Sequence, residues 1–125
     1  MTLPRLRLTA LDCPNALELG YFYEKLTGGT LEPLGDLLPE EVTWIELDTG
    51  HGTLAFQQID DFVSPTWPGG DKPQQLHLEF LVPDLDAGEE FVLSLGGTKA
   101  EHQPGQSFRI YLDPVGHPFC LIKQP

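Results

Sequence analysis

The chain carries one strand–turn–strand pattern twice, and this repeat restricts the possible folds more than any other feature. YLDPVGHPFCLI, residues 111–122, aligns without a gap on ELDTGHGTLAFQ, residues 46–57, at an offset of 65. Segments nearer the start of each half align at an offset of 69, which pairs Leu8 with His77 and Phe22 with Phe91. Repetition at this spacing is typical of folds built from similar units. The two offsets predict a loop four residues longer in the first half, within residues 35–41.

Both halves contain the same predicted elements in the same order: strand, helix and three strands. Each helix has apolar side chains at helical spacing and ends at a glycine pair. A polar segment rich in Pro and Gly separates the halves and has the composition of a linker. The sequence therefore predicts an α+β fold of two tandem βαβββ modules, residues 1–59 and 76–125, joined by linker 60–75. The expected strands are 5–11, 30–34, 42–48, 53–59, 76–82, 98–102, 107–113 and 117–123, and the helices lie within 15–28 and 83–97.

Charge and composition disfavour several classes of partner. The chain has 7 Lys and Arg against 19 Asp and Glu, a net charge of −12, which repels nucleic acids and anionic membrane surfaces. No apolar run reaches the roughly 20 residues that span a bilayer. The first residues lack the pattern of a signal peptide, so we expect a cytoplasmic protein. Cys13 and Cys120 form no CxxC pattern, and we expect both to be reduced, largely buried thiols.

Several motifs together resemble one superfamily. DCPNALELGYFYEKLTGG, LAFQQI, LHLEFLVPDLDAG and YLDPVGHPFCLI resemble the glyoxalase/bleomycin-resistance/dioxygenase proteins, also called the vicinal oxygen chelate superfamily. The resemblance extends over nearly the whole chain. It implies a single glyoxalase-like domain over residues 1–125, whose mixed sheets curl around a shared concave cleft. It also implies a small-molecule partner and a homodimer, since the superfamily commonly pairs subunits.

The resemblance also implies four positions for metal ligands. In this sequence they are Leu8, Ala55, His77 and Cys120. Leu8 and Ala55 have no donor atom, His77 is an ordinary ligand, and Cys120 stands where the superfamily usually has Glu. Two protein ligands make a weak site, because catalytic zinc normally has three. We therefore expect no metal and no other cofactor.

Strand alternation predicts the side chains that face the cleft. If His77 points into it, Glu79 does too, and the two are the candidate catalytic residues. In the middle strands we place Ile45, Leu47, Ile110 and Leu112 under the helices. The predicted ligand-binding residues are then Trp44, Glu46, Gln57, His77, Glu79, Arg109, Tyr111 and Cys120.

Structural roles are the alternative for each of these residues. His77 is then a hydrogen-bonded structural histidine, Glu79 and Arg109 pair with each other or with solvent, and Cys120 is an inert thiol. Trp44 is then part of the core. Trp67, between prolines in the linker, is either a lid over the cleft or a packing residue.

Three functions remain open on the sequence. The first is metal-free binding or sensing of a small organic molecule, which the two aliphatic ligand positions favour. The second is a lyase, isomerase or dioxygenase-type enzyme. It would use His77 and Cys120 with Glu79 or Glu46 to hold a metal, or use His77 and Glu79 as acid and base with Arg109 holding an anionic substrate. The third is an interaction module whose own side chains fill the cleft.

Overall fold

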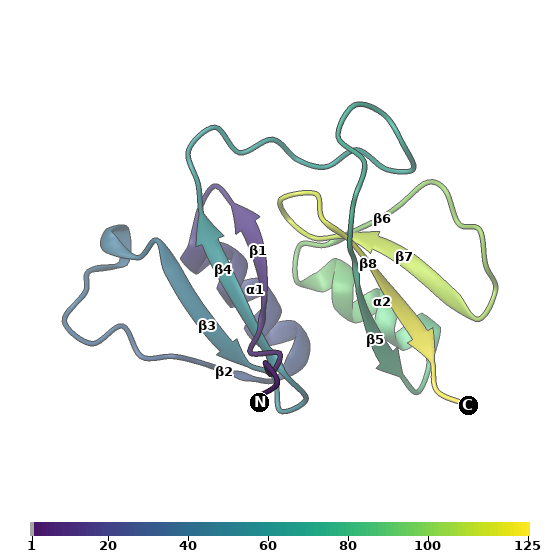
Figure 1. The fold of residues 1–125 in the computed structure, drawn as a ribbon. Helices are drawn as coiled ribbons and strands as arrows, with labels where there is room; N and C mark the ends of the chain where they lie inside the picture. The colour runs from purple at the N-terminus through teal and green to yellow at the C-terminus, as the bar shows by residue number, and fades with distance from the viewer. Residues whose placement is uncertain (1) are drawn as a thin grey trace. The chain divides into compact units, whose positions relative to one another are not determined.

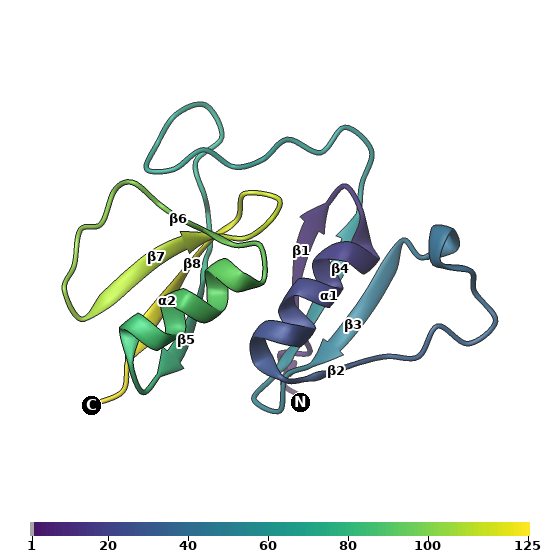
Figure 2. The same cartoon turned by 180° about the vertical axis from the view of Figure 1, so that it is seen from behind.

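A computed structural model describes residues 2–125 and divides the chain into two compact units. The first unit runs to Phe62, and the second runs from Val63 to Pro125. Each unit has one four-stranded mixed sheet with a helix against one face (Figures 1 and 2). The predicted α+β fold of two tandem βαβββ modules is confirmed. Val63–Gln75, most of the predicted linker, is part of the second unit.

The first unit has the sheet order β1-β4-β3-β2. The first strand is parallel to β4, and the other neighbours are antiparallel. A parallel pair needs a long connection, and the chain runs from β1 through α1, β2 and β3 before it reaches β4. The helix α1 links the two edge strands, β1 and β2. The elements are β1 (Thr9–Cys13), α1 (Ala16–Thr27), β2 (Thr30–Leu31), the 3-10 helix η1 (Pro39–Glu41), β3 (Trp44–Asp48) and β4 (Thr53–Gln58).

The helix α1 lies within the predicted range 15–28 and ends at the predicted glycine pair. The Asn15 side chain accepts a hydrogen bond from the Glu18 backbone N–H at 3.0 Å, which satisfies one of the free donors of the first turn. Gly28 ends the helix with a φ of 69°, a left-handed conformation that suits glycine. Between these ends, Tyr23 stacks on Phe56 of β4 with ring centroids 5.6 Å apart. This packing defines the helix-covered face of the first sheet.

The second unit repeats this arrangement with the sheet order β5-β8-β7-β6. The Asp84 side chain caps its helix by accepting from the Ala87 N–H at 2.8 Å. Gly88 lets the helix approach the sheet, since a Cβ there would lie 2.9 Å from the Leu121 side chain. The elements are β5 (Leu78–Val82), α2 (Leu85–Ser94), β6 (Thr98–Lys99), β7 (Phe108–Leu112) and β8 (Pro118–Lys123).

Both leading strands start later than predicted. The first covers Thr9–Cys13 instead of residues 5–11, and the fifth covers Leu78–Val82 instead of 76–82. Their parallel ladders begin at the pairs Thr9–Leu54 and Leu78–Phe119, so the preceding residues have no ladder partner. The face alternation predicted for β5 is correct: Leu78, Phe80 and Val82 are partly buried, whereas Glu79 and Leu81 are exposed.

The two hairpins differ by one residue in their turns. Glu46 lies opposite Ala55 in the first hairpin, and Ile110 lies opposite Cys120 in the second. The outer strands therefore correspond at an offset of 65, but β3 and β7 correspond at 64. The gap-free alignment of the hairpins is wrong for β7, because the second turn holds one residue more. The chain between β1 and β3 is accordingly five residues longer than that between β5 and β7, rather than four.

Within residues 2–125, no helix is both long and apolar enough to cross a membrane.

Candidate ligand-binding pocket

The second unit contains a pocket on the sheet face that α2 does not cover. Its volume is about 290 Å³. Residues from the segment before β5 and from strands β5, β7 and β8 contribute to it. The lining consists of Trp67, Gln74, His77, Glu79, Phe108, Ile110, Pro118, Phe119 and Cys120.

Strand register brings the central residues of the pocket together. Glu79 pairs with Cys120 across the parallel β5–β8 ladder, and Cys120 pairs with Ile110 across the antiparallel β8–β7 ladder. Residues directly opposite one another share a face, so these three form one row across the sheet. His77 lies two residues before Glu79 and therefore points to the same side.

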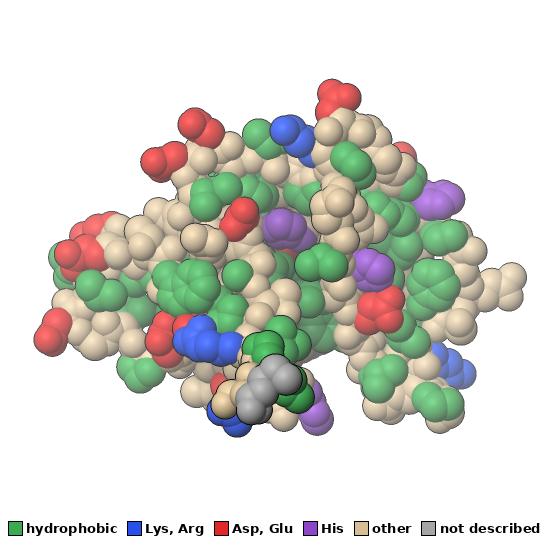
Figure 3. Space-filling view, viewed as in Figure 1, with side chains coloured by type: hydrophobic (Ala, Val, Ile, Leu, Met, Phe, Trp, Pro, Cys, Tyr) green, Lys and Arg blue, Asp and Glu red, His purple; other side chains and the backbone are tan. Residues whose placement is uncertain are grey.

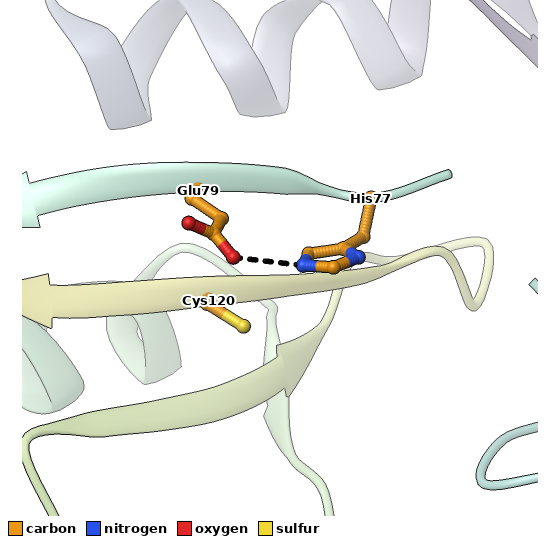
Figure 4. Close-up of side chains that lie close together, drawn as sticks. All are labelled: His77, Glu79 and Cys120. Atoms are coloured by element: carbon orange, nitrogen blue, oxygen red, sulfur yellow. Dashed lines mark hydrogen bonds and ion pairs between the residues drawn. The ribbon is translucent and has the colours of Figure 1, made fainter.

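His77 and Glu79 interact directly. His77 Nε2 lies 2.9 Å from Glu79 Oε2 (Figure 4). Both side chains are accessible, with exposed fractions of 38% and 53%. A carboxylate that accepts from one imidazole nitrogen fixes the ring's orientation. The pair thus has the geometry of an oriented base, and it is also a group that can bind a polar ligand.

Cys120 lies beneath this pair and is only 5% exposed. Burial raises the pKa of its thiol, and the Glu79 carboxylate raises it further. The thiol is therefore neutral at pH 7 and a weak nucleophile, because the thiolate is the reactive form. Cys13 and Cys120 form no disulfide, and both are buried.

An apolar wall completes the pocket. Trp67, Phe108 and Ile122 pack against a buried cluster of Ala100, Ile110 and Cys120. The Trp67 ring also contacts the His102 ring, with centroids 5.4 Å apart. Of the two roles considered for Trp67, the structure favours that of a packing residue in the wall.

Gln74 supplies an unusual acceptor. Its side-chain oxygen is buried and has no hydrogen-bond partner among the residues that the structure describes. A buried acceptor without a donor lowers stability by about 1–3 kcal/mol. Gln74 lines the pocket, so a rotation of its side chain would expose this oxygen to an N–H or O–H group of a bound molecule.

The predicted orientation of Arg109 and Tyr111 is wrong. Arg109 Nη2 lies 2.8 Å from Asp86 Oδ1 of α2, and its Nη1 lies 3.5 Å from Glu89 Oε1. The Tyr111 hydroxyl donates to Glu89 at 3.0 Å. Both side chains therefore lie under the helix, and Arg109 does not pair with Glu79.

The extra residue in the second turn explains this error. A shift of one residue moves every side chain of a strand to the opposite face. The shift places Phe108 and Ile110 toward the pocket, although Ile110 was expected under the helix. The pairing of Ile110 with Cys120 identifies Phe108 and Ile110 as pocket residues, and the gap-free alignment did not contain this register. No pattern in the sequence singled out Gln74 or Phe119.

The acidic Glu89 holds this helix-side cluster together. The hydrogen bond from Lys99, at 2.9 Å, is the main reason that the pKa of Glu89 is lowered. Burial raises the pKa of Tyr111, and the hydrogen bond to Glu89 raises it further. The ion pair with Asp86 raises the pKa of Arg109. The cluster is a packing contact between α2 and the sheet.

 

Trp44, Glu46 and Gln57 belong to the first unit and lie on the sheet face that α1 does not cover. Ile45 and Leu47, which alternate with Trp44 and Glu46 in β3, are buried as predicted. Trp44 Nε1 donates to Glu46 Oε2 at 3.0 Å, and Arg7 Nη2 lies 2.7 Å from the same oxygen. The hydrogen bond from Trp44, followed by that from Arg7, lowers the pKa of Glu46. Gln57 pairs with Trp44 across the β3–β4 ladder. These three residues form a group within the first unit, and His77, Glu79 and Cys120 form another within the second.

The residues do not fit the four-ligand metal site that the superfamily resemblance implies. Leu8 and Ala55 are aliphatic, and Ala10, which corresponds to Glu79 in the first unit, has no donor either. The second unit alone offers a different set: one ligand atom each from His77, Glu79 and Cys120, all within 4.8 Å of one another. These three are the residues able to hold a cation in this pocket.

Comparison with known proteins agrees with this architecture. Residues 9–122 match the family described as Glyoxalase-like domain. The chain belongs to this family. No curated protein matches it.

Solved structures similar to this glyoxalase-like chain share its fold at low sequence identity. The fosfomycin resistance protein FosX from Mesorhizobium loti has a TM-score of 0.71 and 16% identity, covering 99% of this chain and 94% of that one. A glyoxalase/bleomycin resistance protein/dioxygenase family enzyme from Burkholderia phytofirmans PsJN has a TM-score of 0.66 and 15% identity, covering 93% and 95%. An integron cassette protein from V. cholerae has a TM-score of 0.64 and 19% identity, covering 100% and 98%.

Proposed function

We propose that this glyoxalase-like protein binds a small organic molecule in the pocket of its second unit, without a metal. The observation that carries the proposal is the lining itself: an apolar wall of Trp67, Phe108 and Ile110 beside a few polar groups. Ligand sites typically combine apolar walls with a small number of placed polar groups. Such binding fits a resistance or sensing role of the kind that the superfamily includes.

The chemistry of the donors supports binding without a metal. Two of the four superfamily ligand positions are aliphatic. The hydrogen bond between His77 Nε2 and Glu79 Oε2 occupies two atoms that would otherwise be metal ligands. A metal would also have to displace the proton of the Cys120 thiol. Each change opposes metal binding at neutral pH.

A thermal-shift screen of metal-stripped protein tests the proposal. Small aromatic and heteroaromatic compounds are added in the presence of a chelator, and the shift of any hit is measured again in two variants. We expect Phe108→Ala to remove the shift, because Phe108 lines the pocket. His51→Ala is the control, since His51 is exposed in the first unit. Hits that need added metal, or that survive in Phe108→Ala, would contradict the proposal.

An enzyme is the second candidate, and the 2.9 Å contact between His77 and Glu79 favours it. A carboxylate-oriented imidazole is a suitable general base, and Arg109 takes no part because it lies under α2. A lyase or isomerase would need this pair. The test is a turnover assay with each compound that binds. If turnover is found, His77→Ala should abolish it, whereas His51→Ala should not.

We extend the proposal to a cytoplasmic homodimer. Cys13 and Cys120 form no disulfide, which suits a reducing compartment. The strands β1 and β5 are edges of their sheets, and edge strands present backbone groups that can pair with a second copy. Sedimentation equilibrium gives the mass in solution, and a monomer at all concentrations would overturn the dimer.

A further inference from the structure

We infer that the pocket is selective for a small planar aromatic molecule that carries N–H donors and is neutral or positively charged. The inference rests on the binding function proposed above and adds the chemical class of the ligand. It follows from the charge, the acceptors and the walls of the pocket.

The charge of the lining disfavours anions. Among the described residues that line the pocket, Glu79 carries a carboxylate and none is Lys or Arg. Arg109, the cation expected there, is held under α2 by Asp86 and Glu89. The His77 ring already bonds to Glu79. An anionic ligand would therefore lie near Glu79 without a permanent counter-charge, which is costly in a partly desolvated site.

The pocket contains two residues with side-chain oxygen acceptors, Gln74 and Glu79. Gln74 Oε1 is buried and has no partner among residues 2–125, so it lacks a donor. Glu79 accepts at Oε2 from His77, and an ionised carboxylate has about four lone-pair sites in total. A ligand N–H group can donate to Glu79, which a ligand with acceptors alone cannot do, and a second N–H group can donate to Gln74 once that side chain rotates toward the pocket.

The walls and the size set the shape of the ligand. Trp67 and Phe108 line the pocket with aromatic rings, which favour planar partners and attract cations to their faces. The volume of about 290 Å³ is near the lower end for ligand pockets and suits one or two rings. The net charge of −12 adds a long-range attraction for cations, and acidic side chains are spread over the face shown in Figure 3.

Three probes of the same shape test this inference: benzamidine, a cation with N–H donors; benzamide, neutral with N–H donors; and benzoate, an anion without donors. Each is titrated into the full chain and followed by amide NMR shifts, with Phe108, Ile110 and Cys120 as reporters of the pocket. We expect benzamidine to bind most tightly, benzamide more weakly, and benzoate not at all.

Two variants separate the contributions. We expect Glu79→Gln to weaken benzamidine about tenfold and benzamide much less, since a charge-assisted hydrogen bond is about twice as strong as a neutral one. Glu101→Gln, at an exposed position of the second unit, should change neither. Pocket shifts with benzoate as large as those with benzamidine, or equal affinity for all three probes, would overturn the inference and leave the binding function standing. An absence of pocket shifts with every probe would also overturn it, and the separate library screen then decides the binding function.

Discussion

Ile110 lies directly opposite Cys120 in the β7–β8 ladder, and this pairing determines which side chains of β7 reach the pocket. The neighbours of Ile110 in the strand, Arg109 and Tyr111, consequently point to α2. The chemistry available in the pocket thus depends on one residue in the turn between the two strands. A pocket with Arg109 in it would suit anions, whereas the pocket with Ile110 does not.

The register of β7 predicts that substitutions at two neighbouring positions affect ligand binding differently. Ile110→Phe should fill part of the pocket and weaken ligand binding about tenfold, because the larger side chain takes space that the ligand needs. Arg109→Leu removes ion pairs with α2 and should leave the dissociation constant unchanged. Calorimetric titration of both variants with one ligand measures this. Loss of binding in Arg109→Leu alone would show that β7 has the other register.

Glu89 should contribute to stability through Tyr111. The Tyr111 side chain is fully buried and its hydroxyl donates to Glu89. Glu89→Ala leaves that hydroxyl without its acceptor, so we expect a loss of about 1–3 kcal/mol in the free energy of unfolding. Glu89→Gln keeps an acceptor and should lose less. Urea denaturation measures both, with Glu90→Ala at an exposed position as the control; equal stability of Glu89→Ala and Glu90→Ala would refute the role.

The same carboxylate should make stability depend on pH. Lys99 lowers the pKa of Glu89 in the folded protein below its ordinary value of 4.5. A group with a lowered pKa stabilises the fold fully above its unfolded pKa, and that contribution is lost as the pH falls through the folded pKa. We expect the free energy of unfolding to fall less steeply below pH 4.5 in Glu89→Gln than in the wild type. Identical pH profiles of the two proteins would contradict this coupling.

Gln74 should reduce stability and favour binding. Gln74→Leu removes a buried oxygen that has no partner among the described residues, so we expect the free energy of unfolding to rise by about 1–3 kcal/mol. The same variant should bind benzamidine and benzamide more weakly, because it lacks the acceptor that a rotated Gln74 side chain would present to the ligand. Thermal unfolding and NMR titration measure the two effects. A purely structural glutamine would instead lose stability and keep its affinity.

Much of this fold was predictable because its signals are local or repeated. Helix caps at Asn15 and Asp84 and the alternation in β5 follow from short-range chemistry. The repeat gave the order of elements and two modules. The alignment of the two halves failed at β7. A gap-free alignment carries no information on the length of a turn, and one additional residue there reverses the faces of the strand.

The pocket was only partly predictable. His77, Glu79 and Cys120 were identified by position, and the structure brings them together. Gln74 and Trp67 reach the pocket through the irregular segment before β5, and no periodicity predicts where the side chains of such a segment lie. The role of Gln74 depends on a missing partner, which only three-dimensional structure reveals.

The central claim is that the pocket binds its ligand without a metal. Metal content and ligand affinity measured on the same protein preparation test this claim directly. Metal content by elemental analysis is measured on purified protein after dialysis with added zinc, and ligand affinity is measured on the same protein before and after chelation. The account predicts well below one equivalent of metal and an affinity that chelation does not change. A full equivalent of zinc that is lost in His77→Ala, with ligand binding lost on chelation, would contradict the account and establish a metal site at His77, Glu79 and Cys120.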